Sequence, residues 1–290
     1  MRRLTAAATI PILLMSLTAC GQSDSPDPAV PPANATPTIA ASSSASPSPS
    51  VSPAPSQEAP SEAAEASETP ETIVPLYRMN KNYDIVPIDK EKTDRKVVLL
   101  TFDDGPKKSE TLDPILDTLD KHRAKAIFFV NGYRVKEHPE LLEEIANRGQ
   151  TIGNHSWDHI QLGKESADTI RKQIGDVQDL VKEITGSSPV FFRPPHGSGN
   201  EDAHRIAAEY GLLYMTWSNG SLDWEMTGDK IKDKTAAILT NITDQLHSGS
   251  NILMHELPWT AEALDSILSA LEDKGYSFVD PALIDVSAQP

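Results

Sequence analysis

The most constraining feature of the chain is a short apolar run, residues 97–102, that ends in Asp103 and Asp104 and then in Gly105-Pro106. A run of this kind, rich in Val and Leu and ended by Gly-Pro, is typical of a strand buried on both faces in a parallel sheet. The carboxyl ends of such strands are where active sites of α/β folds lie. Two adjacent carboxylates there are costly unless a cation or a proton separates their roles. The alternative is a helix-capping Asp pair in a solvated turn.

Strand-like runs alternate with helical patterns through the rest of the domain, which predicts βαβ units and a parallel sheet. The predicted strands are 97–102, 126–130, 150–154, 190–192, 212–217, 252–254 and 276–279, and the predicted helices are 112–122, 139–148, 167–185, 201–210, 230–247 and 261–274. Gly149, Gly186, Gly211 and Gly275 follow four of these helices, as C-terminal caps do. Residues 77–89 are expected to form an extra pair of short strands.

The first twenty residues predict an export signal, because two arginines precede an apolar stretch at 10–17 that is too short to span a bilayer permanently. The ending Leu17-Thr18-Ala19-Cys20-Gly21 resembles the lipobox of bacterial lipoproteins, which implies that Cys20 is lipidated. The alternative is a general secretory signal with an incidental cysteine. Because Cys20 is the only cysteine, no intramolecular disulfide is expected.

Residues 21–72 consist almost entirely of Pro, Ser, Ala, Thr and acidic residues, a composition that cannot bury enough surface to fold. An extended tether of about 50 residues reaches about 150 Å. We therefore expect the protein to be exported and lipid-anchored to the outer face of the cell membrane, facing the cell wall. Residues 73–290 are long enough for one domain, with its core at about 95–282.

The net charge of the chain is −16, of which the two arginines at the start contribute +2 and the tether −7; the remaining charge of about −11 on the folded part argues against nucleic acid as a partner. It also disfavours the capture of an anionic substrate by bulk attraction. The sequence gives no sign of an oligomer, and we expect a monomer.

Two histidines four residues apart, His155 and His159, follow the third predicted strand. If the segment begins a helical turn, both rings lie on one face at a spacing that lets them share a metal. Alone, such a pair is more often two surface histidines. Together with Asp104 they form a set of two histidines and one carboxylate that leaves coordination positions open for water and substrate.

Three further strand ends carry polar side chains suited to catalysis. Arg193, followed by two prolines that stiffen its loop, can pair bidentately with a buried carboxylate, although a surface salt bridge is the plain alternative. Asp223-Trp224 follows the fifth predicted strand, and His255 ends the sixth. A lone histidine there is usually structural, but polar residues at five strand ends are improbable as an accident.

Five ordered segments resemble the motifs of the NodB-type polysaccharide deacetylases, carbohydrate esterase family 4: residues 101–106, 155–159, 193–197, 223–224 and 253–255. The resemblance covers about residues 95–282. It implies a distorted (β/α)7-type barrel of parallel strands, here with a short N-terminal β extension. It also implies a mononuclear divalent metal, usually Zn²⁺ with Co²⁺, Ni²⁺ or Mn²⁺ as alternatives, and hydrolysis of N-acetyl groups on amino-sugar polymers.

Carried over by position, the resemblance implies that Asp104, His155 and His159 hold the metal, that Asp103 is the general base and His255 the general acid, that Arg193 orients Asp103, and that Asp223 pairs with His255. The backbone N–H of His196 would help to hold the oxyanion. Trp224 is expected to line the acetyl pocket, or else to be a core aromatic.

The sequence departs from the family pattern in two places: His196 stands where many members have Tyr, and Gly220 where many have an extra Asp. An imidazole at position 196 could alter the pH dependence, and Gly220 removes only a supporting contact.

The expected substrate is a cell-wall glycan, foremost the N-acetylglucosamine of peptidoglycan. N-acetylmuramic acid, chitin oligomers and O-acetylated xylan stay open. Two other classes remain: a non-haem iron oxygenase, which also uses two histidines and a carboxylate, and a catalytically silent wall-binding lipoprotein.

Overall fold

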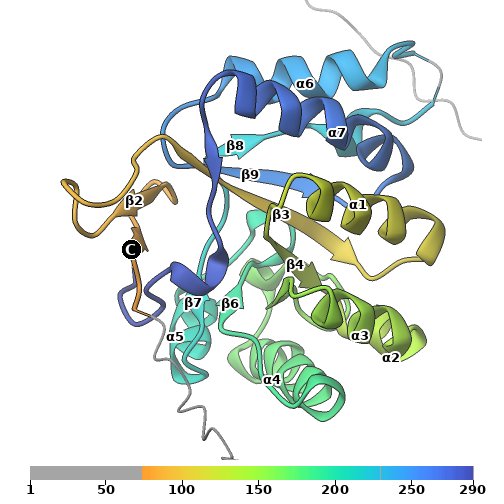
Figure 1. Cartoon of the computed structure of the whole chain (residues 1–290). Helices are drawn as coiled ribbons and strands as arrows, with labels where there is room; N and C mark the ends of the chain where they lie inside the picture. Colours follow the sequence, from red (N-terminus) through yellow and green to blue (C-terminus); the bar gives the residue numbers. More distant parts are fainter. Residues whose placement is uncertain (1–73, 229, 290) are drawn as a thin grey trace, which may run out of the picture. The chain divides into compact units, whose positions relative to one another are not determined.

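In the described part of the chain, a curled parallel sheet forms a half-barrel (Figure 1), as the sequence predicts; seven of its eight strands lie in one continuous order. The computed structural model describes residues 74–228 and 230–289. The predicted signal at 1–20 with Cys20, and the predicted tether at 21–72, lie outside the described residues. No helix in the described part of the chain is both long and apolar enough to cross a membrane.

Strand β3 (Val97–Gly105) lies in the middle of the sheet between β4 (Ala126–Val130) and β9 (Ser250–His255). The order continues from β4 through β5 (Thr151–Asn154) and β6 (Phe191–Phe192) to β7 (Leu213–Tyr214), and from β9 to β8 (Asn219–Gly220). A further short strand, β10 (Ser277–Phe278), pairs with the beginning of β3. All these pairings are parallel, so the carboxyl ends of the strands lie at one edge.

Helices cover the outside of the curled sheet (Figure 1). They are α1 (Ser109–Lys121), α2 (Gly132–Glu137), α3 (Pro139–Asn147), α4 (Ala167–Thr185), α5 (Glu201–Glu209), α6 (Lys234–Asp244) and α7 (Pro258–Asp273). Short 3-10 turns occur at Leu162–Lys164, Pro195–Gly197, Asp223–Glu225 and Pro281–Leu283. The longest helix, α4, is held at its beginning by Ser166, whose side chain accepts a hydrogen bond from the Thr169 N–H, and is followed by Gly186 at φ 80°.

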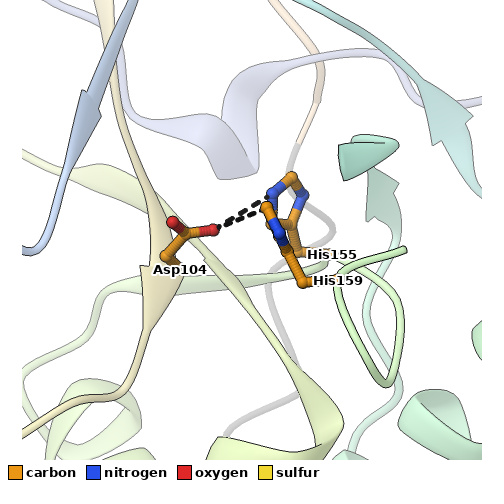
Figure 2. A group of neighbouring side chains, drawn as sticks. All are labelled: Asp104, His155 and His159. Atoms are coloured by element: carbon orange, nitrogen blue, oxygen red, sulfur yellow. Dashed lines mark ion pairs between the residues drawn. The ribbon is translucent and has the colours of Figure 1, made fainter. Parts of the chain in front are cut away.

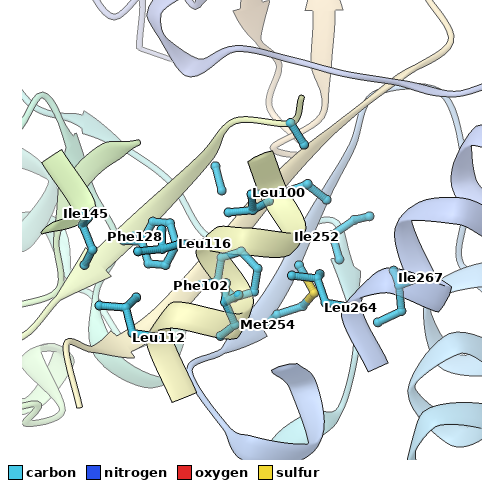
Figure 3. Packing of buried hydrophobic residues seen from close by; sticks show 14 of the residues in the cluster. Leu100, Phe102, Leu112, Leu116, Phe128, Ile145, Ile252, Met254, Leu264 and Ile267 are labelled. Atoms are coloured by element: carbon cyan, nitrogen blue, oxygen red, sulfur yellow. The ribbon is translucent and has the colours of Figure 1, made fainter. Parts of the chain in front are cut away.

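The main core lies between the sheet and several of the helices, among them α1, α3 and α7 (Figure 3). Phe102 of β3 stacks on Phe128 of β4 with ring centroids 5.1 Å apart, and Leu112, Leu116 and Leu264 pack around them. Burying side chains of this size stabilises the fold by about 2–3 kcal/mol each. This packing fixes β3, and with it the position of the two aspartates at its end.

The predicted N-terminal pair of strands is present as β1 (Tyr77–Met79) and β2 (Ile85–Pro87), which run antiparallel. The pair is joined to the rest of the domain by backbone hydrogen bonds: Asp285 N–H donates to the Tyr77 carbonyl (2.8 Å), and Ile85 N–H donates to the Gly249 carbonyl (2.8 Å). The extension is therefore attached to both the C-terminal segment and the turn that precedes β9.

Several boundaries differ from the sequence prediction. The predicted strand 212–217 is shorter, and the chain then enters β8, which the sequence did not indicate. Helix α2 was not predicted either. The predicted helix 230–247 begins only at Lys234, because the Asp233 side chain caps it by accepting a hydrogen bond from the Ala236 N–H.

Two glycines with left-handed backbone test how the extension is held. A Cβ on Gly249 (φ +88°) would overlap the Ile85 carbonyl oxygen, whereas a Cβ on Gly186 (φ +80°) would meet nothing within 4 Å. We expect Gly186→Ala to lower the free energy of unfolding by about 1–2 kcal/mol from backbone strain alone. Gly249→Ala should lower it by about 3 kcal/mol or more, because overlap with a backbone atom is added. Urea denaturation measures both, and equal losses would contradict the proposed attachment.

Candidate active site

The end of β3 directs its two aspartates to different partners. The register of β3 against β4 shifts between Asp103 and Gly105, and Asp104 has a left-handed backbone with φ 67°. Asp103 keeps its place in the sheet, paired in register with His255 of β9. Adjacent carboxylates in the sequence therefore need not share one position in the site.

Asp104, His155 and His159 converge on one point (Figure 2). The Asp104 Oδ1 atom lies 3.5 Å from His155 Nε2 and 2.9 Å from His159 Nε2, and one ligand atom from each residue lies within 4.8 Å of the others. The structure thus brings together the three side chains that the sequence analysis predicted as metal ligands.

The two histidines do not lie on a helical turn, so the conditional prediction of one is wrong. Ser156 and His159 both have left-handed backbone, with φ 67° and 56°. The loop is held instead by Asn154, whose side-chain oxygen accepts a hydrogen bond from the Ser156 N–H (2.9 Å). The spacing of four residues brings the rings together through a loop conformation that the sequence does not reveal.

The donor set fits a divalent cation. The Nδ1–H of His155 donates to the Arg193 carbonyl (2.7 Å), which leaves the lone pair on Nε2 facing Asp104. The Asp104 Oδ1 atom is buried and faces the Nε2 atoms of both histidines. Burial acts to raise the pKa of Asp104, but His155 and His159 outweigh it, and the pKa falls well below its usual range. One carboxylate oxygen and two imidazole nitrogens are ligands that Zn²⁺ and similar ions accept.

Asp103 is held by Arg193, whose side chain is fully buried. The Nη1 of Arg193 donates to Asp103 Oδ1 (2.7 Å) and to Thr101 Oγ1 (2.8 Å). The Nη2 donates to the Thr216 carbonyl (2.9 Å) and to Asn251 Oδ1 (3.2 Å). The expected bidentate pairing is therefore wrong, because one arm of the guanidinium binds Asp103 and the other binds the strands around it.

His255 is paired with Asp223, which is fully buried. The Nδ1–H of His255 donates to Asp223 Oδ1 (2.7 Å), while Asp223 Oδ2 accepts from the His255 backbone N–H (2.6 Å) and from Thr260 Oγ1 (2.7 Å). Burial acts to lower the pKa of His255, but the hydrogen bond and charge of Asp223 outweigh it, so this pKa is raised. The imidazole is thus kept protonated to a higher pH than an ordinary histidine.

A cavity of about 440 Å³ lies over these groups and is lined by all five of the central residues: Asp103, Asp104, His155, His159 and His255. Its apolar wall is formed by Trp217, Trp224 and Leu253. Trp224 is 37% exposed and packs edge-on against His255, so it is a wall of the cavity and not a core aromatic. Trp217 was missed by the sequence reasoning, since no motif contains it.

The two departures from the family pattern also lie near this cavity. His196 has φ 58°, and its ring packs edge-on against His159 with centroids 4.6 Å apart. Burial, and then the charge of His159, lower the pKa of His196. Gly220 is buried in β8, and its N–H donates to Gln245 Oε1 (3.2 Å).

Glu256, which the sequence reasoning also missed, is a buried carboxyl directly after His255. Its Oε1 accepts from the Lys107 N–H (2.7 Å), and its own N–H donates to the Asp103 carbonyl (3.3 Å), so it joins the end of β9 to the loop after β3. A Cβ on Gly105 would overlap the Glu256 carboxyl, which explains the glycine there. Burial raises the pKa of Glu256 to about 7. The only sequence signal was an acidic residue following a strand-end histidine.

The fold and site together define an α/β half-barrel with a metal-type centre at its strand ends. The sequence matches the polysaccharide deacetylase family over residues 90–215. The peptidoglycan-N-acetylglucosamine deacetylase of Bacillus cereus is 35% identical over 199 residues, which are 66% of this chain and 70% of that protein. The chain belongs to the polysaccharide deacetylase family, and the resemblance inferred from the motifs is confirmed.

Two further relatives are longer than this chain. Peptidoglycan-N-acetylglucosamine deacetylase PgdA of Listeria monocytogenes is 38% identical over 207 residues, which are 69% of this chain. Peptidoglycan-N-acetylmuramic acid deacetylase PdaC of Bacillus subtilis is 35% identical over 208 residues, which are 70% of this chain. The aligned part of the chain spans 42% of the length of each of these two relatives.

Solved structures show the same fold. The structure of PdaC from Bacillus subtilis has a TM-score of 0.57 at 35% identity, with 64% of this chain and 88% of that chain covered. A CE4 family pseudoenzyme from Bacillus anthracis has a TM-score of 0.60 at 29% identity, with 68% of each chain covered. Because this fold also occurs in a pseudoenzyme, activity has to be argued from the site residues.

Removal of one imidazole tests the metal centre. We expect His159→Ala to weaken binding of Zn²⁺ by at least about 100-fold, since even residues that merely orient a ligand contribute 10- to 100-fold. His204→Ala, which changes an exposed histidine of α5, should leave the affinity unchanged. Elemental analysis after dialysis, with a competition titration, measures both variants. Equal zinc content in the two would remove His159 from the ligand set.

The buried carboxyl of Glu256 predicts a pH-dependent stability. Its folded pKa of about 7 lies above the ordinary 4.5, so the contribution of the neutral Glu256 to stability is fully present below pH 4.5 and is lost as pH rises through 7. Glu256→Gln cannot ionise, so we expect its free energy of unfolding to gain about 3 kcal/mol relative to the wild type as pH rises through this range. Urea denaturation at both pH values checks this. Glu262→Gln, at an exposed position on α7, is the control, and a gap independent of pH at position 256 would refute the argument.

Proposed function

We propose that the protein is a divalent-metal-dependent deacetylase that hydrolyses N-acetyl groups of amino sugars in a cell-wall glycan and releases acetate. The observation that carries this is the arrangement of two proton-transfer groups beside one metal-type centre. Asp103 and His255 are opposite each other in the register of β3 and β9, and both line the cavity that contains Asp104, His155 and His159. Family membership and the names of the relatives support the same reaction.

Asp104, His155 and His159 would hold the ion, for which we propose Zn²⁺, with Co²⁺, Ni²⁺ or Mn²⁺ as alternatives. Such an ion supplies a Lewis acid that polarises an amide carbonyl and lowers the pKa of a water molecule. Asp103, fixed by Arg193, accepts the proton of the attacking water as general base. The Arg193 guanidinium balances the charge at Oδ1 of Asp103, while the other carboxylate oxygen, Oδ2, lies 3.7 Å from His155 Nε2, beside the metal-type centre.

His255 gives a proton to the departing amine as general acid, since Asp223 keeps the imidazole protonated and fixes its orientation. The backbone N–H of His196 is proposed to stabilise the oxyanion. Trp224 and Leu253 supply an apolar wall that suits the acetyl methyl group. The site thus contains one group that accepts a proton, Asp103, and one group that donates a proton, His255.

A silent binding protein and an iron oxygenase are the weaker candidates. A silent protein has no need of two charged networks, Arg193 with Asp103 and Asp223 with His255, whose desolvation is costly. An oxygenase with two histidines and a carboxylate does not require a general base and a general acid beside the ion. Both networks are accounted for by hydrolysis.

The proposed substrate is peptidoglycan, foremost its N-acetylglucosamine, because relatives named for this sugar are 35% and 38% identical. N-acetylmuramic acid is the alternative that the relative PdaC supports. The proposed location is the outer face of the cell membrane, with a lipid on Cys20 and residues 21–72 as the tether. The export signal and the Pro-rich composition support this location.

The base assignment is tested by Asp103→Asn, which keeps the shape but removes the basic carboxylate. We expect acetate release from an N-acetylated glycan to fall by about 10²- to 10⁴-fold, with bound metal retained. Asp179→Asn, at an exposed position on α4, should change neither quantity. Acetate is measured by a coupled assay and metal by elemental analysis. An Asp103→Asn enzyme of unchanged activity would rule out this base.

The acid assignment predicts a shift of the pH profile. Because Asp223 raises the pKa of His255, the proton-donating form persists to higher pH in the wild type. In Asp223→Asn this pKa falls, so the alkaline limb of kcat/KM should move to lower pH while the acidic limb stays in place. The profile measured from about pH 5 to 10 decides this, and a uniform loss at every pH would show that Asp223 only supports the fold.

A further inference from the structure

A second, smaller cavity adjoins the catalytic one. It has a volume of about 130 Å³ and shares Asp104, Trp224 and His255 with the larger cavity. Its other walls include Lys107, Thr227 and Trp259. We call these six residues the lysine subsite. Because the two cavities share three residues, a chain of sugars bound over the site can enter both.

Lys107 is a half-buried cation in this subsite, in the loop that follows Asp104. Desolvation lowers its pKa, and the charge of Arg134 lowers it further, although Asp104, Glu256 and Asp223 act in the opposite direction. Among the described residues no carboxylate oxygen lies within 4.0 Å of its Nζ. Glu256, a buried acid that follows β9, accepts a hydrogen bond from the Lys107 backbone N–H through its Oε1. The ammonium group is thus partly desolvated without a direct partner, which is costly unless it binds a ligand.

A second cation increases the positive potential at this place. Arg134 of α2 is close enough to influence the pKa values of both Lys107 and Glu256. Its Nε atom is buried and has no hydrogen-bond partner among the described residues. Of the acids that act on Lys107, Asp104 would be engaged by the proposed ion and Asp223 is paired with His255, so the two cations favour an anionic group in this cavity over a neutral one.

The remaining walls suit a sugar ring. Trp224 and Trp259 present aromatic surface, and the indole N–H of Trp259 donates to the Asp223 carbonyl (2.7 Å), which fixes that ring. Thr227 adds a hydroxyl group. Apolar rings with a few placed polar groups are the usual composition of a small-ligand site.

We propose that the lysine subsite binds a carboxylate carried by the glycan, and that Lys107 makes the enzyme prefer an anionic strand to a neutral one. In a strand that alternates N-acetylglucosamine with N-acetylmuramic acid and carries no peptide, the lactyl group on O3 of the second sugar is a free carboxylate, and it lies next to the glycosidic bond that joins this sugar to the first. A carboxylate there is carried on the sugar adjacent to the N-acetylglucosamine whose acetyl group is removed. This inference rests on the proposed function and deepens it.

The test compares the zinc-loaded full chain with Lys107→Gln on two tetrasaccharides of equal length. One is the neutral N-acetylglucosamine tetramer, and the other alternates N-acetylglucosamine with N-acetylmuramic acid without peptides. We expect Lys107→Gln to raise KM about tenfold for the alternating tetramer, with kcat preserved, since a charge-assisted hydrogen bond is lost. The neutral tetramer should change less than about twofold. Lys107→Arg should keep the preference, and Lys108→Gln, at the exposed neighbouring position, should change neither substrate.

Equal losses on the two substrates would overturn the inference, because Lys107 would then act only through the loop that carries Asp104. No loss on either substrate would overturn it as well.

If the wild type releases acetate from neither tetramer, the proposed function fails, and calorimetric binding of the same tetramers decides the inference separately. Weaker binding of the alternating tetramer alone by Lys107→Gln would support it, and unchanged binding would refute it. Mass spectrometry of the products shows which sugar loses its acetyl group, and loss from N-acetylmuramic acid would overturn the assignment of the carboxylate to the neighbouring sugar.

Discussion

The ion pair between Arg193 and Asp103 is the interaction on which the rest of the site depends. Arg193 is fully buried and Asp103 almost so, so the desolvation cost of the two charges has to be offset by further hydrogen bonds, which both Nη atoms of Arg193 make. Those bonds go to Thr101 in β3, to the Thr216 carbonyl after β7, and to Asn251 in β9. Its aromatic neighbour, Phe129, lies 4.3 Å from the guanidinium carbon. One side chain thereby ties together strands that are far apart in the sequence.

The same residue connects the base to the metal-type centre through its backbone. The Arg193 carbonyl accepts the Nδ1–H of His155, while the Arg193 side chain holds Asp103. Asp103 and Asp104 can therefore differ in role although they are adjacent. Asp104 faces both imidazoles, whereas Asp103 is bound by a guanidinium through Oδ1, approaches only His155 (3.7 Å, through Oδ2) and lies in register with His255. Glu256, which follows His255 at the end of β9, accepts a hydrogen bond from the Lys107 N–H and so connects β9 to the loop after Asp104.

The strands of the sheet and the polar residues at their ends could largely be predicted from the sequence, because short local patterns indicate them. The Val- and Leu-rich run and its Gly-Pro end identify β3. Asp104 follows the first predicted strand and His155 the third, and strand ends of a parallel sheet lie at one edge, which predicts that the two side chains are close. The features that the sequence did not predict depend on tertiary contacts. Helix α2 begins at Gly132, and glycine in a sequence usually indicates a turn. Here the glycine is needed for packing, because a Cβ would overlap the Trp157 ring. Strand β8 is two residues long and exists through its pairing with β9. The left-handed backbone of Ser156 and the single arm that Arg193 gives to Asp103 are set by tertiary contacts and leave no trace in the sequence pattern.

The unequal roles of the two aspartates are the central claim, and anomalous diffraction from crystals grown with Zn²⁺ tests it most directly. The account predicts one peak at about 2.0–2.2 Å from an Asp104 oxygen and from the Nε2 atoms of His155 and His159. Asp103 should remain on Arg193 and outside the coordination sphere. A peak bound by both aspartates, or a peak that leaves out either histidine, would contradict it.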